Sequence, residues 1–474
     1  MKLKHISYIV LFIVSFLNAQ NNIKGDNFEF DKEFEEHPEI VLADNYNHYL
    51  FTVTNRDGML SSHKLTLRKF DQKNQLVDTF VKDFAIDLYT LHNFHGVYVI
   101  DDTKIAFIVE SYSNKRKINE LIKYVFDKKT GTYSSDVISS HASTDDKKFG
   151  SFYVKKSLNH KFIGITYETR NKKKEPEITE CMVLNNSTFG QVFTKTVQFE
   201  DEFYTDEKIM SNSGHFIFLR RPRSYKETNY FVVISKDGES KKTIEENTRV
   251  HKPIAISIGT QDYLIAFNYK DKGIRRGDFG SILLYDLEAG KILKNNDIED
   301  FNKIKDIEEV NLGAVFVENN QIRLFVEGRY KSGTKPSTTF PNSTMKDPVY
   351  NYGPSHLFVF SYDGTLTNNI NLEVNPQSEP TLYHSFGMLN VKGEYIINPG
   401  TYYKGNNLHN WLYKINPNNN FAITYLNYHY QISDNNSYKF VNQVVYYFPD
   451  TNRFLTAAVV TNENKMGLLS FTLE

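Results

Sequence analysis

Clusters of basic residues, several of them beside tyrosines, are the groups in this sequence that most clearly suggest chemistry. Five segments together hold eighteen Lys and Arg residues and one acid, Asp271: Asn114–Lys117 (NKRK), Arg170–Lys174 (RNKKK), Arg220–Lys226 (RRPRSYK), Lys270–Arg276 (KDKGIRR) and Arg329–Lys335 (RYKSGTK). A Tyr-Lys pair recurs at 225–226, 269–270, 330–331 and 403–404. Cations hold sulfate and carboxylate groups, and aromatic faces pack on sugar rings. These segments therefore predict a surface for an anionic glycan or another polyanion.

The residues that we expect to contact such a ligand come from these segments and pairs. They are Lys115, Arg116, Lys172, Lys173, Arg220, Arg221, Arg223, Tyr225, Tyr269, Lys270, Arg275, Arg276, Tyr330, Lys331, Tyr403 and Lys404. Acidic stretches such as Phe199–Phe203 (FEDEF) offer a second interpretation, because they could pair with the basic segments. If they do pair, the basic segments need not bind a ligand. The pairing would also add little stability, because exposed ion pairs contribute only about 0–1 kcal/mol each.

One kind of apolar strand recurs along the chain and must position these segments. It begins at Tyr49, Lys104, Lys161, His215, Tyr263, Gln321, Glu394 and Arg453, at intervals of 48 to 73 residues. A shorter apolar strand precedes each one, and a hairpin with Asp or Asn near Gly at its tip follows, as turns require. Period-two alternation dominates, so the chain is predicted to be all-β, built from four-stranded antiparallel meanders.

The two ends of the chain complete the last meander. The eighth unit stops after Met466–Glu474, and the missing outer strand is predicted at Asn27–Phe34, ahead of the first complete unit. Pairing the two would remove open sheet edges. The chain resembles the β-propeller superfamily in this architecture, and it is similar to exported bacterial propellers of unassigned role. The resemblance implies an eight-bladed β-propeller over residues 20–474, with seven blades and an added sheet as the alternative.

In a propeller whose strands a to d run outward, the b–c and d–a connections share one face. The basic segments fall in b–c connections and the acidic stretches in d–a connections. Several histidines lie where strand a begins, near the mouth of the central channel: His37, His92, His95, His251 and His384. Imidazoles gathered there could shuttle protons or bind Zn²⁺, but recurring histidines also serve packing. We predict no metal ion or cofactor and name no catalytic residue.

A long insertion follows Arg329. Residues 331–354 are rich in Ser, Thr, Pro and Asn, and they fall in a b–c connection. We expect an insertion loop there, which would either be mobile or form a partial lid carrying Tyr350 and Tyr352.

The N-terminus has the pattern of a secretory signal peptide. Lys2 and Lys4 precede the apolar run Ile6–Leu17, and Ala19 offers a cleavage point, so residues 1–19 are predicted to be removed. The run is too short for the roughly 20 residues that cross a bilayer, and no Cys follows it to carry a lipid, although an N-terminal anchor is the alternative. No later segment has the length of a membrane span. The single cysteine, Cys181, excludes an intrachain disulfide, and a net charge of −1 argues against a general nucleic-acid binder.

These features favour a secreted or periplasmic binding module for an anionic glycan or an extracellular protein. The alternatives are a glycan lyase or hydrolase that works at the channel mouth and a structural component of an envelope complex. Motifs for common hydrolases and for phosphate binding are absent from the sequence. The sequence predicts neither the ligand nor the oligomeric state.

Overall fold

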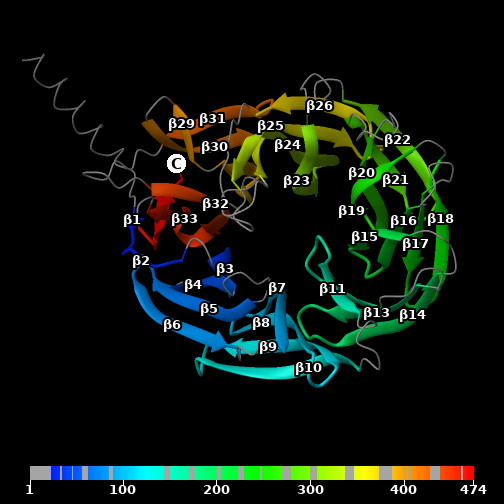
Figure 1. Ribbon diagram of the computed structural model, residues 1–474. Helices are drawn as coiled ribbons and strands as arrows, with labels where there is room; N and C mark the ends of the chain where they lie inside the picture. Colours follow the sequence, from blue (N-terminus) through cyan, green and yellow to red (C-terminus); the bar gives the residue numbers. More distant parts are fainter. Residues whose placement is uncertain are drawn as a thin grey trace, which may run out of the picture. The chain divides into compact units, whose positions relative to one another are not determined.

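Within the residues that it describes, the computed structural model consists of β-strands and one short 3₁₀ helix, η2 (Pro449–Thr451) (Figure 1). It describes residues 23–31, 35–44, 46–55, 62–84, 89–142, 150–169, 177–199, 204–221, 229–245, 248–269, 279–298, 307–336, 346–372, 387–399, 401–404, 407–427, 438–460 and 463–473. The predicted signal peptide lies outside the described residues. No helix in these ranges is long and apolar enough to cross a membrane.

Eight antiparallel sheets follow one another along the chain, and each is a blade of a β-propeller. Blade 1 has β3 (Glu35–Ala43), β4 (Asn47–Asn55), β5 (Ser62–Asp71) and β6 (Leu76–Asp83). Blade 2 has β7 (Thr90–Asp101), β8 (Lys104–Ser113), β9 (Ile118–Asp127) and β10 (Thr132–Ala142). Blade 3 has β11 (Ser151–Lys156), β12 (Phe162–Glu168), β13 (Glu177–Asn185) and β14 (Gln191–Phe199). Blade 4 has β15 (Tyr204–Met210), β16 (Phe216–Arg221), β17 (Tyr230–Ile234) and β18 (Glu239–Thr243).

The second half of the chain repeats this order. Blade 5 has β19 (Val250–Ile258), β20 (Gln261–Tyr269), β21 (Phe279–Asp286) and β22 (Lys291–Asp297). Blade 6 has β23 (Ile307–Glu318), β24 (Gln321–Pro336), β25 (Lys346–Ser361) and β26 (Leu366–Asn371). Blade 7 has β27 (Gly387–Val391), β28 (Glu394–Asn398), β29 (Thr401–Lys404), β30 (Asn407–Asn416) and β31 (Ala422–Asn427). Blade 8 has β32 (Tyr438–Phe448), β33 (Arg453–Val460) and β34 (Lys465–Thr472).

The predicted closure of the last blade is confirmed. The N-terminal strands β1 (Ile23–Lys24) and β2 (Phe28–Glu29) both pair with β34 and supply its outer strand (Figure 1). The closing segment therefore begins a few residues earlier than the predicted Asn27–Phe34 and is split in two. Every recurrent strand predicted from the sequence is the second strand of its blade, so the eight-bladed prediction holds and the seven-bladed alternative does not.

The chain divides into two compact units, each with its own apolar interfaces between blades. Unit 1 comprises Met1–Thr52, Leu67–Thr79 and Thr381–Glu474; one of its clusters packs Phe30, Leu50 and Phe70 against Leu455 and Leu468. Unit 2 comprises Val53–Thr66 and Phe80–Pro380; its clusters join each blade to the next, as Phe267 and Leu284 do with Leu324 and Phe358. Burying the apolar face of one sheet against its neighbour is what makes a single meander stable here.

Much of the insertion is regular. Residues 331–336 continue β24 and residues 346–354 continue β25, and the ladder runs as far as Pro336 opposite Lys346. Where an irregular loop was expected, the described residues form a long hairpin.

Candidate functional site

The first strand of several blades in unit 2 carries a β-bulge close to a charged or titratable residue. In β7 the register shifts between Phe94 and Gly96, next to His95. In β15 it shifts between Thr205 and Glu207, at Asp206, and in β19 it shifts between His251 and Ile254, where Lys252 has a φ of 46°. Bulges turn side chains away from the regular alternation and are frequent beside functional sites. These first strands and the ends of the second strands form the candidate site.

Glu110, near the end of β8, is the centre of a hydrogen-bonded group in blades 2 and 3. Its Oε1 accepts from Asn119 Nδ2 at 2.6 Å and from the Phe152 backbone N–H at 3.2 Å. Its Oε2 lies 3.2 Å from His95 Nε2 and accepts from Asn93 Nδ2 at 3.3 Å. Burial acts to raise the pKa of Glu110, but the hydrogen bonds from His95 and Asn119 outweigh it, and the pKa is lowered. Glu110 is therefore an ionised carboxylate with its acceptor sites occupied.

Arg220 is enclosed at the end of β16. Its guanidinium is fully buried, lies over the Phe199 ring at 3.9 Å, and donates to Glu177 Oε2 and to Thr205 Oγ1, each at 2.7 Å. Thr205 Oγ1 in turn donates to Glu177 Oε1 at 2.8 Å. This predicted ligand residue thus joins blade 3 to blade 4 from inside.

Arg221, the next residue, also meets a carboxylate. It lies 2.6 Å from Asp206 Oδ2 and donates to the Val250 carbonyl at 3.0 Å, so it connects blade 4 to blade 5. Beside it, burial and the charge of Asp206 raise the pKa of Glu207, although Lys155 and Lys252 act in the opposite direction. Lys208 lies 3.0 Å from Glu168 Oε1 and 3.6 Å from the centroid of the Tyr153 ring. Acidic and basic groups of neighbouring blades therefore meet along these strand ends.

The other predicted ligand residues are placed as follows. Lys115 is exposed in the β8–β9 turn, and Arg116 beside it is 3.0 Å from Glu120 with its side chain 56% exposed. Tyr269, Tyr330, Lys331, Tyr403 and Lys404 lie in strands whose backbone alone is described. The remaining members lie outside the described residues: Lys172, Lys173, Arg223, Tyr225, Lys270, Arg275, Arg276 and, among the histidines, His384.

Two of the Tyr-Lys pairs lie within strands, and the backbone register places each member. Tyr330 is opposite Asn351 and Lys331 is opposite Tyr350; in the same way Tyr403 is opposite Leu408 and Lys404 is opposite Asn407.

The predicted histidines do not share one environment. His37 is 62% exposed and lies 4.0 Å from Glu36, whereas His92 is buried and stacked on Phe84 at 4.8 Å. His95 contacts Glu110, and His251 is half-buried in β19. Within the described ranges, no three His, Cys, Asp or Glu side chains are grouped as a metal site would require.

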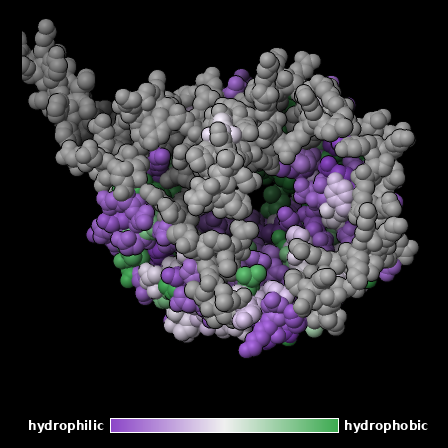
Figure 2. Space-filling view, viewed as in Figure 1, coloured by the Kyte–Doolittle hydropathy of each residue, from purple (hydrophilic) through white to green (hydrophobic). Residues whose placement is uncertain are grey.

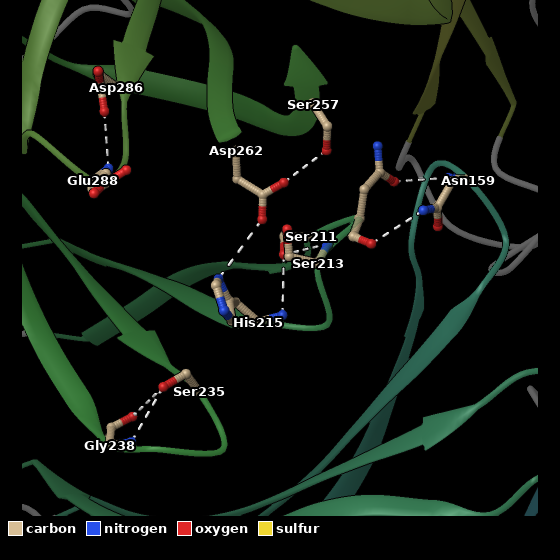
Figure 3. Close-up of polar contacts among 11 residues, drawn as sticks. Asn159, Ser211, Ser213, His215, Ser235, Gly238, Ser257, Asp262, Asp286 and Glu288 are labelled. Carbon is tan, nitrogen blue, oxygen red and sulfur yellow. Dashed lines mark hydrogen bonds and ion pairs between the residues drawn. The ribbon is translucent and has the colours of Figure 1, made fainter. Parts of the chain in front are cut away.

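A second polar cluster connects the a–b turns of blades 3, 4 and 5 (Figure 3). Asn159 donates through its backbone N–H to Asn212 Oδ1 at 2.8 Å, Ser257 donates to Asp262 Oδ1 at 2.7 Å, and His215 Nδ1 is 3.7 Å from Asp262 Oδ2. In a hydrolytic triad the histidine stands between the serine and the acid. Here the acid stands between the other two, so the cluster links blades and is not arranged for nucleophilic catalysis.

Glu110, Asn119, Glu177 and Asp262 were not predicted as site residues, although the sequence carries a signal for the first of them. In four of the second strands the apolar run is followed by a charged residue: KIAFIVE (Glu110), KFIGITYE (Glu168), HFIFLR (Arg220) and QIRLFVE (Glu327). Glu110, Arg220 and Glu327 are all buried. A charge at the end of an otherwise apolar strand indicates a buried, partnered group.

No family model and no curated protein matches this chain. The solved structures similar to this chain include β-propeller domains. The propeller domain of the trilobed protease from Pyrococcus furiosus is 11% identical to this chain, with a TM-score of 0.39. The match covers 82% of this chain and 94% of that domain. An acylaminoacyl peptidase from Pyrococcus horikoshii is 10% identical over 91% of this chain but only 59% of its own, with a TM-score of 0.40. A polysaccharide lyase of the ulvan lyase family PL25 is 9% identical to this chain, with a TM-score of 0.35. The match covers 78% of this chain and 90% of the lyase chain.

Proposed function

We propose that this chain is an exported binding module, a single propeller domain left after removal of residues 1–19, and that its ligand is an anionic glycan. The ligand would bind on the side where the b–c connections leave the blades. The observation that carries this proposal is the way the ends of the second strands are held. The buried side chain of Glu110 is hydrogen-bonded near the end of β8, and the buried side chain of Arg220 is paired with Glu177 at the end of β16. A basic connection follows each of these strands.

Strand ends that are held in place favour binding by the connections that follow them, because ordering a loop on a ligand costs free energy. The same strand order recurs in the blades of unit 2, so their b–c connections leave at equivalent strand ends. The eighteen basic residues lie in five of these connections and at the strand ends beside them. Since Arg220 and Arg221 already meet carboxylates, the cations left for a ligand are those beyond the strand ends, such as Lys115, Lys172 and Lys173.

A catalytic alternative is favoured by one contact, the 3.2 Å approach of His95 Nε2 to Glu110 Oε2. Such a pair could exchange a proton with a glycan. Glu110 also accepts from Asn119, Asn93 and the Phe152 backbone, however, and these donors stabilise its charge without moving a proton. We therefore favour binding over catalysis.

Binding of heparin, alginate and dextran to the purified protein tests the proposal. We expect heparin or alginate to bind at about 50 mM salt and to bind more weakly at about 300 mM, because salt screens exposed charges. Dextran, which is neutral, should not bind. Charge reversal of Lys115, Lys172 and Lys173 to Glu should weaken binding at least about tenfold.

The matched control reverses three exposed lysines on c–d turns, Lys73, Lys129 and Lys236, which changes the net charge equally. It should leave affinity within about twofold, because those turns lie at the opposite strand ends. Equal losses in both triple variants would mean that overall charge is responsible. Absence of any charged glycan among the ligands would overturn the proposal and leave an extracellular protein or an envelope complex as the partner. N-terminal sequencing of the exported protein tests cleavage after Ala19.

A further inference from the structure

Exposed apolar side chains gather on blade 2 at the end where its basic connection leaves. Tyr89 lies directly before β7, the innermost strand of the blade (Figure 1), and is 56% exposed; Leu91 in β7 is 44% exposed. His92 is buried, whereas Asn93 is exposed again. Exposure therefore alternates as it does along a strand, and Tyr89, Leu91 and Asn93 belong to one face. Exposed apolar side chains that form one patch are typical of binding sites.

Tyr112, near the end of β8, belongs to the same face. The register places Tyr112 directly opposite Leu91, and Glu110 opposite Asn93. Opposed residues of antiparallel strands share a face, with Cβ atoms about 4.5–5.5 Å apart. Tyr112 is half-buried, so it adds a second tyrosine beside the more exposed Leu91. We call Tyr89, Leu91 and Tyr112 the blade 2 platform.

The basic connection of blade 2 begins at the edge of this platform and is held against it. The Asn114 backbone N–H donates to the Tyr89 carbonyl at 2.7 Å, and Tyr112 Oη lies 3.5 Å from Asn114 Oδ1. Lys117 Nζ donates to the same Oδ1 at 2.8 Å. Lys115, between Asn114 and Lys117, is exposed. The turn therefore carries cations next to the platform.

The two carboxylates nearest this turn are engaged elsewhere. Glu120 lies 3.0 Å from Arg116, and Glu110 accepts from Asn119 Nδ2 at 2.6 Å. Neither arrangement uses Lys115. A negative group that approached the platform would therefore be complemented by the Lys115 ammonium group.

We propose that the blade 2 platform binds one sugar ring of an anionic polysaccharide, and that Lys115 binds the carboxylate or sulfate group of that sugar unit. Aromatic and aliphatic side chains pack on the apolar face of a pyranose ring, and an ammonium group complements the anionic substituent. Because the turn is hydrogen-bonded to the platform, little ordering is needed when the ligand binds. This inference rests on the proposed function and adds to it the subsite that holds a sugar ring.

The test compares two double variants that each remove one exposed tyrosine and one exposed aliphatic side chain. The platform variant is Tyr89→Ala with Leu91→Ala. The matched control is Tyr46→Ala with Val99→Ala: these residues are 77% and 41% exposed, and both lie at the a–b ends of their blades. Affinities are measured for heparin, alginate and polyphosphate, an anionic chain that has no sugar rings.

The platform variant should distinguish a glycan from a plain polyanion. We expect it to bind the charged glycan at least about fivefold more weakly than the parent, because ring packing and apolar contact are lost. Its affinity for polyphosphate should stay within about twofold of the parent's, as should the affinities of the control variant for every ligand. Tyr89→Phe with Leu91→Met keeps a ring and an apolar side chain and should stay within about threefold for the glycan. Thermal unfolding of each variant establishes that the blade is intact.

The role of Lys115 is tested by salt. Lys115→Gln should weaken binding of the charged glycan about threefold at about 50 mM salt and less at about 300 mM, because salt screens an exposed charge. Lys129→Gln, an exposed change on the c–d turn of the same blade, is the control and should have no effect. Equal affinities of these two variants would show that Lys115 does not bind the anionic group.

Each result decides one proposal. If the parent binds heparin or alginate and the triple lysine reversal weakens it, the proposed function stands. The platform inference is overturned if the platform variant then binds the glycan as well as the parent or the control does, if it loses as much affinity for polyphosphate, or if the Phe and Met variant binds as weakly. A parent that binds the glycan but not polyphosphate would support the platform, because rings would then be required. If the parent binds no charged glycan, both proposals are overturned.

Discussion

Asn74, in the turn between β5 and β6, donates a hydrogen bond from Nδ2 to the Oγ of Ser470 in β34, at 3.0 Å and 396 residues away in the sequence. The same Nδ2 donates to the Ile23 carbonyl of β1 at 3.1 Å. Arg453 of blade 8 donates to the Gln72 carbonyl in that turn. One turn of blade 1 therefore holds the N-terminal closing strand against the last strand of the chain.

Asn74→Ala should destabilise this closure. Asn74 is fully buried and has a φ of 61°, which Asn adopts more readily than Ala. Losing both hydrogen bonds should lower the free energy of unfolding by about 1–3 kcal/mol, measured by urea denaturation. Lys73→Ala, an exposed change in the same turn, should shift it by less than about 0.5 kcal/mol. Equal effects would show that the Asn74 side chain contributes nothing.

Gly25→Ala should loosen the closing strand itself. A Cβ at Gly25 would clash with the Asn74 carbonyl oxygen, so the backbone between β1 and β2 would have to move. We expect faster hydrogen exchange of the Gly25 amide, which donates to the Leu468 carbonyl at 3.0 Å. Gly238→Ala is the control, because nothing lies within 4 Å of its Cβ position. Unchanged exchange at Gly25 would contradict the tight approach.

Most of the fold could be predicted from the sequence because a blade is a local unit. The strands that begin at Tyr49 and Arg453 show their alternation, their turn residues and their spacing within about 60 residues. Closure was also predictable, since an apolar strand was missing at one end of the chain and present at the other. The length of β24 and β25 was not, because Ser, Thr, Pro and Asn after Arg329 are typical of loops even where they extend paired strands.

The site was harder to predict because burial and partnership depend on neighbouring blades. The sequence shows Arg220 and Lys115 as members of similar basic segments, yet the first is fully buried against Glu177 and the second is exposed. The partner of Arg220 lies 43 residues away in another blade, a distance at which no local pattern operates. On the visible face, the described surface is largely hydrophilic with scattered apolar residues, so hydropathy does not mark a site either (Figure 2).

Arg220→Met should destabilise the protein far more than the same change at Arg116. Removing the guanidinium leaves Glu177, 26% exposed, without its partner at 2.7 Å and exposes the Phe199 ring to a cavity. We expect a loss of about 3 kcal/mol in the free energy of unfolding. Arg116→Met breaks an exposed pair with Glu120 and should cost about 0–1 kcal/mol. Similar losses in chemical denaturation would show that burial does not distinguish the two arginines.

His48 should make stability depend on pH in the mildly acidic range. Burial, with a further contribution from the charge of Arg453, lowers the pKa of His48 to about 3, and its ring is stacked on Phe70 at 5.6 Å. In the unfolded chain the pKa of the imidazole lies near its ordinary value of 6.5. Below that pH the unfolded chain binds a proton that the folded chain does not. The free energy of unfolding should therefore fall as pH drops from 6.5 toward 3, by up to about 1.4 kcal/mol per pH unit.

His48→Phe keeps a ring between Phe70 and Phe448 and removes the titrating group. Its free energy of unfolding should decline less steeply than the parent's between about pH 6.5 and pH 4, because only the other titrating groups remain. His37→Asn is the matched control, since His37 is 62% exposed and Asn tolerates its φ of 53°. The control should keep the parent's slope. If the free energy of unfolding of His48→Phe falls with pH as steeply as the parent's, then His48 is protonated in the folded chain. That would require a group that stabilises the imidazolium against burial.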